Sequence, residues 1–212
     1  MSRVTAKICG LSTPETLDAA IAGGASHVGF VFFPPSPRNL TFDVARGLAN
    51  RVPDHVGRVG VFVDPDDQLL DAAIGAAALD ALQLHKTAPD RVATIRARGI
   101  AVWAAVAVKA RADLDVAFNY REAADKILYD AKTPDDAALP GGMGLRFDWS
   151  LLNGFRHPLP WALSGGLTPE NVSEAARRTG ALLVDTSSGV ESAPGVKDVD
   201  KIVAFLKAVA QC

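Results

Sequence analysis

Eight short segments rich in β-forming residues alternate with longer alanine-rich helical patterns along the whole chain, at a spacing of roughly 26 residues that suits repeated βα units. Each segment is apolar at consecutive positions rather than at alternate ones, which is typical of parallel strands buried on both faces. The expected strands cover residues 6–9, 27–32, 58–63, 81–84, 102–106, 126–129, 161–163 and 182–186.

This alternation predicts an α/β protein folded as a single (β/α)8 TIM barrel domain over residues 1–212. No linker rich in serine, glycine or proline divides the sequence. A doubly wound open sheet is the structural alternative, although that fold usually has fewer strands at this length. In a barrel, the loops at the carboxyl ends of the strands carry the chemistry, so we expect the functional residues there.

Helix starts support the same pattern. Residues 13–16 read Thr-Pro-Glu-Thr, with Thr13 as N-cap and Pro14 at the first helical position. Residues 168–171 repeat this start almost letter for letter as Thr-Pro-Glu-Asn. Apolar stripes with helical period predict further helices over residues 66–77, 89–98 and 199–209.

The composition excludes several classes of partner. The chain has 212 residues, 49% of them hydrophobic, and a formal net charge of −2 without a basic stripe, so nucleic acid is not an expected partner. No apolar run is long enough to span a bilayer, and the N-terminus lacks a signal-peptide core, so we expect no membrane partner. The outer helices of a barrel can be apolar for packing or for a partner, which leaves a monomer and a homodimer open.

Cysteine and histidine usage argues against disulfides and metals. Cys9 and Cys212 are the two cysteines, which suits a reducing compartment and a cytoplasmic location. The four histidines are scattered without the spacing of metal ligands, so no metal site is expected.

Two glycine turns near the C-terminal end predict a phosphate site. Residues 164–167 (Ser-Gly-Gly-Leu) and 186–189 (Thr-Ser-Ser-Gly) each end an apolar run with small residues that can bring backbone N–H groups close to an anion. The first turn is expected to open directly into a helix whose positive end faces the same spot. Phosphate sites after the last strands are frequent in barrels.

Two long loops follow expected strands two and six, over residues 33–40 and 131–146, and long loops in compact domains are usually functional. The second contains Gly141-Gly-Met-Gly144, which resembles a dinucleotide loop only weakly because it does not follow a strand directly. We expect it to fold over the phosphate instead. The predicted phosphate-binding residues are therefore Gly142, Gly144, Gly165, Gly166, Ser187, Ser188 and Gly189.

Cys9 and Asp130 are the candidate catalytic residues because each ends an expected strand. Cys9 could be a buried structural thiol. However, the helix start at Thr13 lies close by and would favour its thiolate. Asp130 could cap local turn amides, or it could act as a general acid whose pKa is raised by apolar surroundings. Strands one and six are expected on opposite sides of the barrel mouth, so the two groups would flank a substrate.

Four further residues are candidates for substrate binding. Arg38 stands in a proline frame on the first long loop, where its guanidinium could grip a carboxylate, although surface arginines are usually only solvated. Gln83 and His85 end the fourth strand, and His85 could equally be a satisfied core histidine. Asp185 ends the eighth strand, where it could orient a hydroxyl or bond the amides of the serines that follow.

Taken together, these segments resemble the phosphoribosylanthranilate isomerase family of the tryptophan pathway over nearly the whole length. Two positions depart from the family pattern: Lys86 stands where glycine is frequent, and Met143 where threonine is frequent. The motifs that carry the resemblance are Lys7-Ile-Cys-Gly, Val28-Gly-Phe-Val-Phe with Ser36-Pro-Arg, Leu82-Gln-Leu-His, Asp130 before a long loop, Gly142-Met-Gly with Phe147-Asp-Trp, Ser164-Gly-Gly-Leu-Thr-Pro-Glu-Asn-Val and Val184-Asp-Thr-Ser-Ser-Gly-Val-Glu.

The resemblance implies an Amadori rearrangement, an aldose–ketose isomerisation in which N-(5′-phosphoribosyl)anthranilate becomes 1-(2-carboxyphenylamino)-1-deoxyribulose 5-phosphate. It implies Cys9 as general base, Asp130 as general acid and Arg38 as the group that holds the anthranilate carboxylate. The reaction needs one acid and one base, so the resemblance implies no cofactor.

Other functions remain as alternatives at this point. The related isomerase of histidine biosynthesis places an aspartate where Cys9 stands. Indole-glycerol-phosphate synthase uses a lysine near the strand ends, whereas Lys7 and Lys126 are expected at strand starts. A catalytically silent ligand-binding barrel would be expected to have lost Cys9 or Asp130, and both are present.

Overall fold

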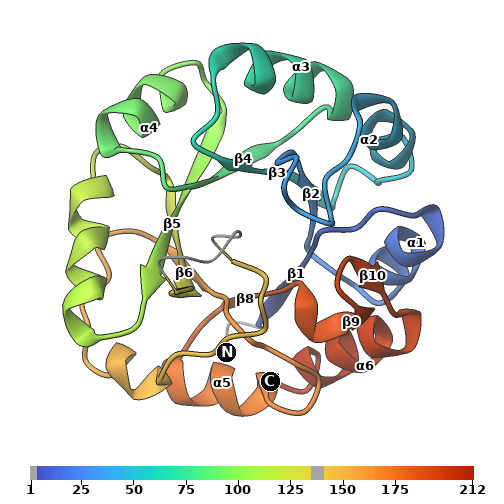
Figure 1. Ribbon diagram of the computed structural model, residues 1–212. Helices are drawn as coiled ribbons and strands as arrows, with labels where there is room; N and C mark the ends of the chain where they lie inside the picture. The colour runs from blue at the N-terminus through green and yellow to red at the C-terminus, as the bar shows by residue number, and fades with distance from the viewer. Residues whose placement is uncertain (1–3, 135–140) are drawn as a thin grey trace.

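The computed structural model describes residues 4–134 and 141–212, which form a closed barrel of eight parallel strands in sequence order (Figure 1). The predicted barrel is therefore confirmed. Pairing of Thr5 with Leu183 and of Ile8 with Thr186 closes the sheet between the last strand and the first. The strands are β1 (Thr5–Cys9), β2 (His27–Val31), β3 (Gly57–Val63), β4 (Ala81–His85), β5 (Ala101–Val108), β6 (Lys126–Ala131), β7 (Trp161–Leu163) and β8 (Leu183–Thr186).

Helices surround this barrel, one segment after each strand (Figure 1). The connections after β5 and β6 carry 3-10 helices in place of α-helices. Among the residues described, no helix combines the length and the apolarity needed to cross a bilayer. The helices are α1 (Pro14–Ala22), α2 (Phe42–Ala49), α3 (Asp67–Ala77), α4 (Pro89–Arg96), η1 (Arg111–Tyr120), η2 (Trp149–Leu152), α5 (Val172–Thr179), η3 (Ser188–Val190) and α6 (Val199–Val209).

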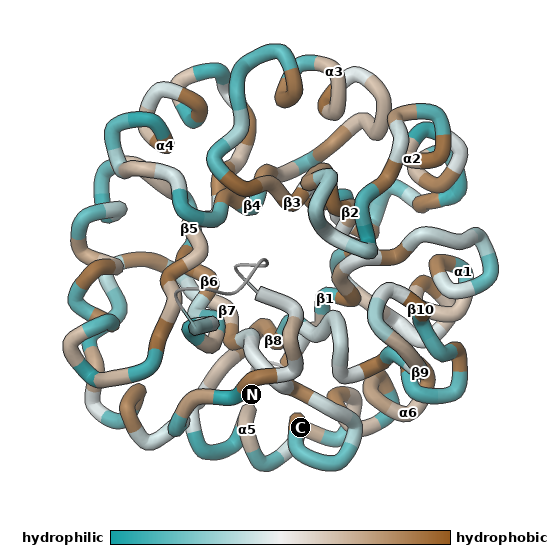
Figure 2. Tube along the Cα trace, viewed as in Figure 1, coloured by the Kyte–Doolittle hydropathy of each residue, from teal (hydrophilic) through white to brown (hydrophobic). Residues whose placement is uncertain are grey.

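Apolar side chains fill the space on both sides of the strands. The larger cluster lies between strands and helices, as with Phe30 of β2, Leu17 of α1 and Phe205 of α6. Figure 2 shows the strands in hydrophobic colours, notably β3 and β4, and much of the outer helical surface in hydrophilic ones. A smaller cluster fills the barrel interior towards the amino ends of the strands, and we call it the barrel floor: Val59, Ala81, Trp103, Leu128, Ala162 and Leu183.

The first helix begins as predicted, whereas the second predicted start is wrong. Thr13 is the N-cap of α1, and its hydroxyl accepts a hydrogen bond from the amide of Thr16. After β7, residues 168–171 form a turn, and α5 begins only at Val172. The side chain of Asn171 causes this difference: its Oδ1 accepts from the Thr168 amide and its Nδ2 donates to the Gly166 carbonyl. The glycine turn therefore does not open directly into the helix.

A small hairpin outside the βα pattern follows the last barrel strand. After β8 the chain makes the single turn of η3, then pairs β9 (Glu191–Ala193) with β10 (Val196–Lys197) in antiparallel fashion. Figure 1 shows this hairpin beside the barrel, close to β1 and α6. It brings two charged residues, Glu191 and Lys197, to the carboxyl end of the barrel, and both are buried.

Candidate active site

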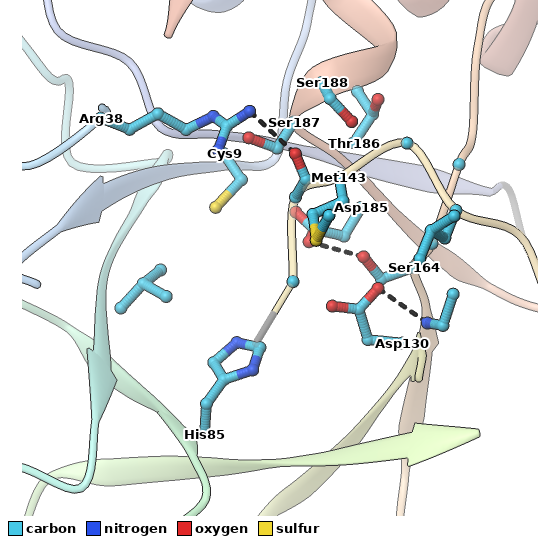
Figure 3. A pocket seen from close by; sticks show the side chains of 18 of the residues that line it. Cys9, Arg38, His85, Asp130, Met143, Ser164, Asp185, Thr186, Ser187 and Ser188 are labelled. Atoms are coloured by element: carbon cyan, nitrogen blue, oxygen red, sulfur yellow. Dashed lines mark hydrogen bonds between the residues drawn. The ribbon is translucent and has the colours of Figure 1, made fainter. Parts of the chain in front are cut away.

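The main cavity lies at the carboxyl ends of the barrel strands, where a barrel carries its chemistry. Its lining comes from seven of the eight barrel strands or the loops that follow them, all except β5, and includes every site residue predicted from the sequence. Figure 3 shows Cys9, His85 and Asp130 converging on this cavity from three different strands. The structure thus brings together the proposed acid, base and phosphate segments, whose roles stay predictions.

Cys9 is the last residue of β1, and its thiol is buried. Burial raises the pKa of the Cys9 thiol, Asp185 raises it further, and the cations Lys7 and Lys197 only partly offset this rise. The start of α1 near Thr13 was expected to favour a thiolate, but burial is the largest influence on this thiol and the net result is a raised pKa of Cys9. Cys9 and Cys212 are both free thiols, the first buried and the second exposed.

Asp130 faces the same cavity from β6 and is 7% exposed. Burial, reinforced by the negative charge of Asp185, raises the pKa of Asp130 to about 7. Its Oδ1 accepts a hydrogen bond from the Ala131 amide at 2.9 Å, so the carboxyl group both caps a local amide and faces the cavity. Two glycines leave room for it, since a Cβ on Gly141 would lie 2.5 Å from Oδ2 and one on Gly165 would lie 3.2 Å from Oδ1.

Around the closed sheet, the path from β1 to β6 through β8 and β7 is shorter than the path through β2, β3, β4 and β5. β1 pairs with β8, β8 with β7, and β7 with β6, so only two strands separate Cys9 from Asp130 on that side. The two strands, which were expected on opposite sides of the mouth, are thus one position short of directly opposite on the eight-stranded ring. The side chains still enter the cavity from separate walls (Figure 3).

Arg38 is buried at 5% exposure, so the alternative of a solvated surface arginine was wrong. Its Nε and Nη2 donate to the two carboxylate oxygens of Glu191 at 2.7 and 2.8 Å, and Nη2 also donates to the Gly142 carbonyl at 2.9 Å. Nη1 lies next to Gly142, where a Cβ would approach it to 2.8 Å. One edge of the guanidinium is thus held by the protein, and Nη1 is left beside the cavity.

Glu191 and Lys197 are members of this cluster that the sequence did not single out. Lys197 donates from Nζ to Glu191 Oε1 at 2.5 Å and to the Ser187 carbonyl at 3.0 Å. Burial by itself would raise the pKa of Glu191, but Arg38 and Lys197 outweigh burial and lower it. A glutamate two residues after the predicted phosphate turn was the available signal, but its partners lie on other elements.

The three predicted phosphate segments meet at the cavity rim. A Cβ on Gly166 would lie 2.9 Å from the Gly144 carbonyl oxygen, so these two turns are in contact. A Cβ on Gly144 would meet the Ser188 hydroxyl at 3.7 Å, which joins the third segment. Gly142, Gly144, Gly165 and Gly166 have φ between 62° and 90°, a region that favours glycine.

A buried polar chain lies deeper in the barrel, and sequence reasoning missed its centre. Lys7 is central in β1 rather than at the start of the strand, and it is 0% exposed. Its Nζ donates to Asp185 Oδ1 at 2.8 Å and to Gln83 Oε1 at 3.0 Å. Ser164 donates to the second oxygen of Asp185 at 3.1 Å, so Asp185 bonds these side chains instead of the serine amides after it.

His85 continues this chain toward the cavity. Its Nε2 lies 2.9 Å from Gln83 Nε2, and the ring lines the cavity. Burial lowers the pKa of His85 to about 4, so the imidazole is neutral at pH 7. The described residues contain no group of three or more histidine, cysteine or carboxylate side chains placed to hold a metal ion.

The chain matches known proteins over almost all of its length. Residues 6–208 match the family described as N-(5′-phosphoribosyl)anthranilate (PRA) isomerase. The chain is 54% identical to the N-(5′-phosphoribosyl)anthranilate isomerase of Zymomonas mobilis subsp. pomaceae, with 97% of this chain and 98% of the relative covered. It is 55% identical to the Paracoccus denitrificans isomerase, with 96% and 95% covered.

Solved structures give the same result. The phosphoribosyl anthranilate isomerase of Thermotoga maritima superimposes with a TM-score of 0.87 at 40% identity, covering 99% of this chain and 100% of that one. A phosphoribosyl anthranilate isomerase in complex with reduced 1-(o-carboxyphenylamino)-1-deoxyribulose 5-phosphate superimposes with a TM-score of 0.85 at 38% identity and the same coverage. By its sequence, its closed barrel and its full-length similarity, this chain belongs to the N-(5′-phosphoribosyl)anthranilate isomerase family.

Proposed function

We propose that this protein converts N-(5′-phosphoribosyl)anthranilate to 1-(2-carboxyphenylamino)-1-deoxyribulose 5-phosphate in tryptophan biosynthesis. One observation carries the chemistry: a buried carboxyl group with its pKa raised to about 7 shares a cavity with a buried thiol. Membership of the isomerase family supports the substrate. We further propose that one domain, residues 1–212, performs the whole reaction.

In the first step, Asp130 acts as the general acid. It gives its proton to the furanose ring oxygen, and the C1′–O bond breaks to leave an iminium ion. A carboxyl group with a pKa near 7 keeps a proton in a substantial fraction of molecules at neutral pH, which supports this role. An aspartate at its ordinary pKa would be almost fully ionised there.

In the second step, Cys9 acts as the general base. Its thiolate takes the proton from C2′, which the neighbouring iminium has made acidic, and the electron pair of that C–H bond neutralises the iminium nitrogen. The resulting enolamine tautomerises to the ketone. Proton removal at C2′ and proton donation at the ring oxygen occur at different atoms, so an acid and a base on separate walls of the cavity suit the reaction (Figure 3).

The two ends of the substrate hold these atoms in place. The segments containing Gly142, Gly165 and Ser187 line the rim and would bind the phosphate through backbone N–H groups. Arg38 would bind the anthranilate carboxylate through the part of its guanidinium that Glu191 leaves free. Binding energy from both remote ends then serves to align the reacting centre. The sugar hydroxyls would be contacted or oriented from the inner end of the cavity by His85, Gln83 and Asp185.

The oligomeric state is part of the proposal only as a choice between monomer and homodimer. Among the similar structures, one at a TM-score of 0.83 is of monomers generated from the dimeric isomerase of Thermotoga maritima. Sedimentation of the purified protein distinguishes the two states.

The decay of anthranilate fluorescence tests the reaction. Freshly made phosphoribosylanthranilate is mixed with the purified protein, and the decay is compared with the spontaneous rate in buffer. We expect a large acceleration from the natural chain and from Cys212→Ser, whose changed thiol is exposed and is not part of the cavity lining. No acceleration by either protein would overturn the proposed function.

A further inference from the structure

Lys7 is a fully buried charged residue that the proposed proton transfers do not use. It lies in the middle of β1 at 0% exposure, and it is absent from the cavity lining, so it does not touch a ligand there. Burial opposes its charge, but Asp185 and Cys9 outweigh burial and raise the pKa of the Lys7 ammonium. A charge kept in such a position needs partners, and these partners connect it to the proposed site.

The first connection runs through Gln83 to His85. An ammonium group can only donate, so the Gln83 oxygen must face Lys7, at 3.0 Å, and the Gln83 NH2 group must face His85 Nε2, at 2.9 Å. Because the NH2 group donates, Nε2 of His85 has to accept and carries no proton. The neutral ring of His85 then carries its proton on Nδ1, and this becomes the donor that it can offer to a ligand in the cavity.

The second connection is to Cys9, two residues further along β1 and therefore on the same side of the strand. Gly29 of β2 lies against both side chains, since a Cβ there would approach Cys9 Sγ to 2.9 Å and Lys7 Cε to 3.2 Å. The charged groups that act on the thiol are Lys7 on the same strand, Asp185 on β8 and Lys197 on β10. Arg38, His85 and Asp130 line the same cavity, and Glu191 lies behind Arg38.

We propose that Lys7 is a positioning residue whose buried ammonium favours the thiolate form of Cys9 and holds His85 as its Nδ1–H tautomer. This inference rests on the proposed function, in which Cys9 is the base, yet it concerns the state of the site before any substrate binds. The alternative is that Lys7 has a purely structural role, which would account for its ion pair with Asp185. Buried ion pairs often contribute little net stability, so the pair by itself does not show what the charge is for. A purely structural role would not require the charge of Lys7 to act on Cys9.

The test measures the reactivity of Cys9 as a function of pH. In a Cys212→Ser background, Cys9 is the one remaining thiol, and its alkylation by iodoacetamide is followed by intact mass. Lys7→Gln keeps donors for Asp185 and Gln83 but removes the charge. We expect the midpoint of the pH–rate profile to move up by about one to three pH units, with roughly 10- to 1,000-fold slower alkylation at neutral pH and convergence at high pH.

Lys126→Gln is the matched control, because Lys126 is also a barrel-strand lysine but lies over the Trp103 ring at the amino end of β6. Its profile should match that of the Cys212→Ser parent. An unshifted profile in Lys7→Gln, or a rate reduced by the same factor at every pH, would overturn the proposal, because either result describes access or structure rather than charge. Circular dichroism checks that each variant folds.

A measurement on the natural chain covers the case in which Lys7→Gln does not fold. Nitrogen NMR of the 15N-histidine-labelled protein, with the His85 signals assigned by comparison with His85→Gln, should show a neutral ring protonated at Nδ1 at pH 7. Protonation at Nε2 would overturn the proposal. Failure of the proposed function is separate: it appears as absent fluorescence decay, whatever the alkylation profile.

Discussion

Arg38 and Glu191 form a two-point ion pair across 153 residues of sequence, with Nε and Nη2 of the guanidinium 2.7 and 2.8 Å from the two carboxylate oxygens. Lys197 completes the cluster on the same carboxylate. The loop after β2 is thereby fastened to the hairpin after β8, and Arg38 reaches the cavity in a fixed orientation. The group proposed to bind the substrate carboxylate is itself oriented by a protein carboxylate.

Glu191→Gln should therefore destabilise the protein and weaken substrate binding together. The change leaves two buried cations, Arg38 and Lys197, without their shared anion, and breaking a buried pair typically costs about 3–5 kcal/mol. Urea unfolding measures the loss, and KM should rise because Arg38 is no longer held. Glu174→Gln breaks an exposed pair with Arg178 and should change stability by less than about 0.5 kcal/mol. Equal, small losses in both variants would contradict this account.

Cys9→Ala tests the proposed base. We expect kcat to fall by about 10²–10⁴-fold with KM little changed, since the thiol acts on a proton rather than on the ends of the substrate. Steady-state fluorescence assays give both constants. Cys212→Ser should behave like the natural chain, because that thiol is exposed. Turnover close to normal in Cys9→Ala would mean that another group removes the C2′ proton.

The pH profile should reveal an acid whose pKa lies below that of the base. Burial raises the pKa of Asp130 to about 7 and also raises that of Cys9 above its usual range. The rate depends on the fraction of enzyme in which Asp130 is protonated and Cys9 is ionised. Because the pKa of the acid lies below that of the base, this fraction rises up to pH 7, is level between the two pKa values and falls above the thiol pKa. We expect kcat/KM to follow it. In Asp130→Asn the residual activity should keep rising through pH 7 without a break. A break near pH 7 in that variant would assign the lower limb to another group.

Asp130 should also make stability depend on pH, with a sign that follows from its raised pKa. The folded state binds the proton up to about pH 7, whereas the unfolded chain loses it near pH 3.8, the ordinary pKa of an aspartate. Stability from this group is thus full below pH 4 and decreases until pH 7, by a few kcal/mol in all. Asp130→Asn should consequently be more stable than the natural chain at pH 8. Urea melts at pH 5 and pH 8 measure the difference, and a less stable variant at pH 8 would contradict it.

Gly189→Ala should disrupt the phosphate segments. A Cβ at Gly189 would lie 1.8 Å from the Leu167 carbonyl oxygen, so the turns after β7 and β8 would have to separate. We expect a loss of roughly 1–3 kcal/mol and a raised KM. Gly75→Ala in α3 is the control, since nothing lies within 4 Å of its Cβ and alanine favours a helix by about 1 kcal/mol. Thermal melts and KM values compare the two, and a normal KM in Gly189→Ala would remove this turn from the phosphate site.

The parts of this fold that depend on local sequence could be predicted. Eight apolar runs at regular spacing gave the barrel, and residues at strand ends, such as Cys9 and Asp130, had to lie at its mouth once the fold was known. Lys7 shows the limit of that reasoning. The expected strand began at residue 6 and β1 begins at Thr5, and this shift of one residue was enough to place a central, buried lysine at an expected strand start.

What depends on distant contacts could not be predicted. Glu191 meets Arg38 only because an irregular hairpin returns to the barrel mouth. The start of α5 was misplaced because Asn171 fastens a turn to Gly166, which competes with helix formation. The state of the Cys9 thiol likewise depends on the folded chain: a nearby helix start is visible in the sequence, but the burial that raises the pKa of this thiol is not.

The barrel floor of Val59, Trp103, Leu128 and their neighbours has a consequence for traffic through the enzyme. These side chains close the amino end of the barrel, so the cavity opens at the carboxyl end alone. Substrate that enters and product that leaves therefore use the same opening. A product molecule that has not left blocks the next substrate. Product should therefore inhibit competitively with substrate. At high substrate concentration, we expect product release to limit turnover.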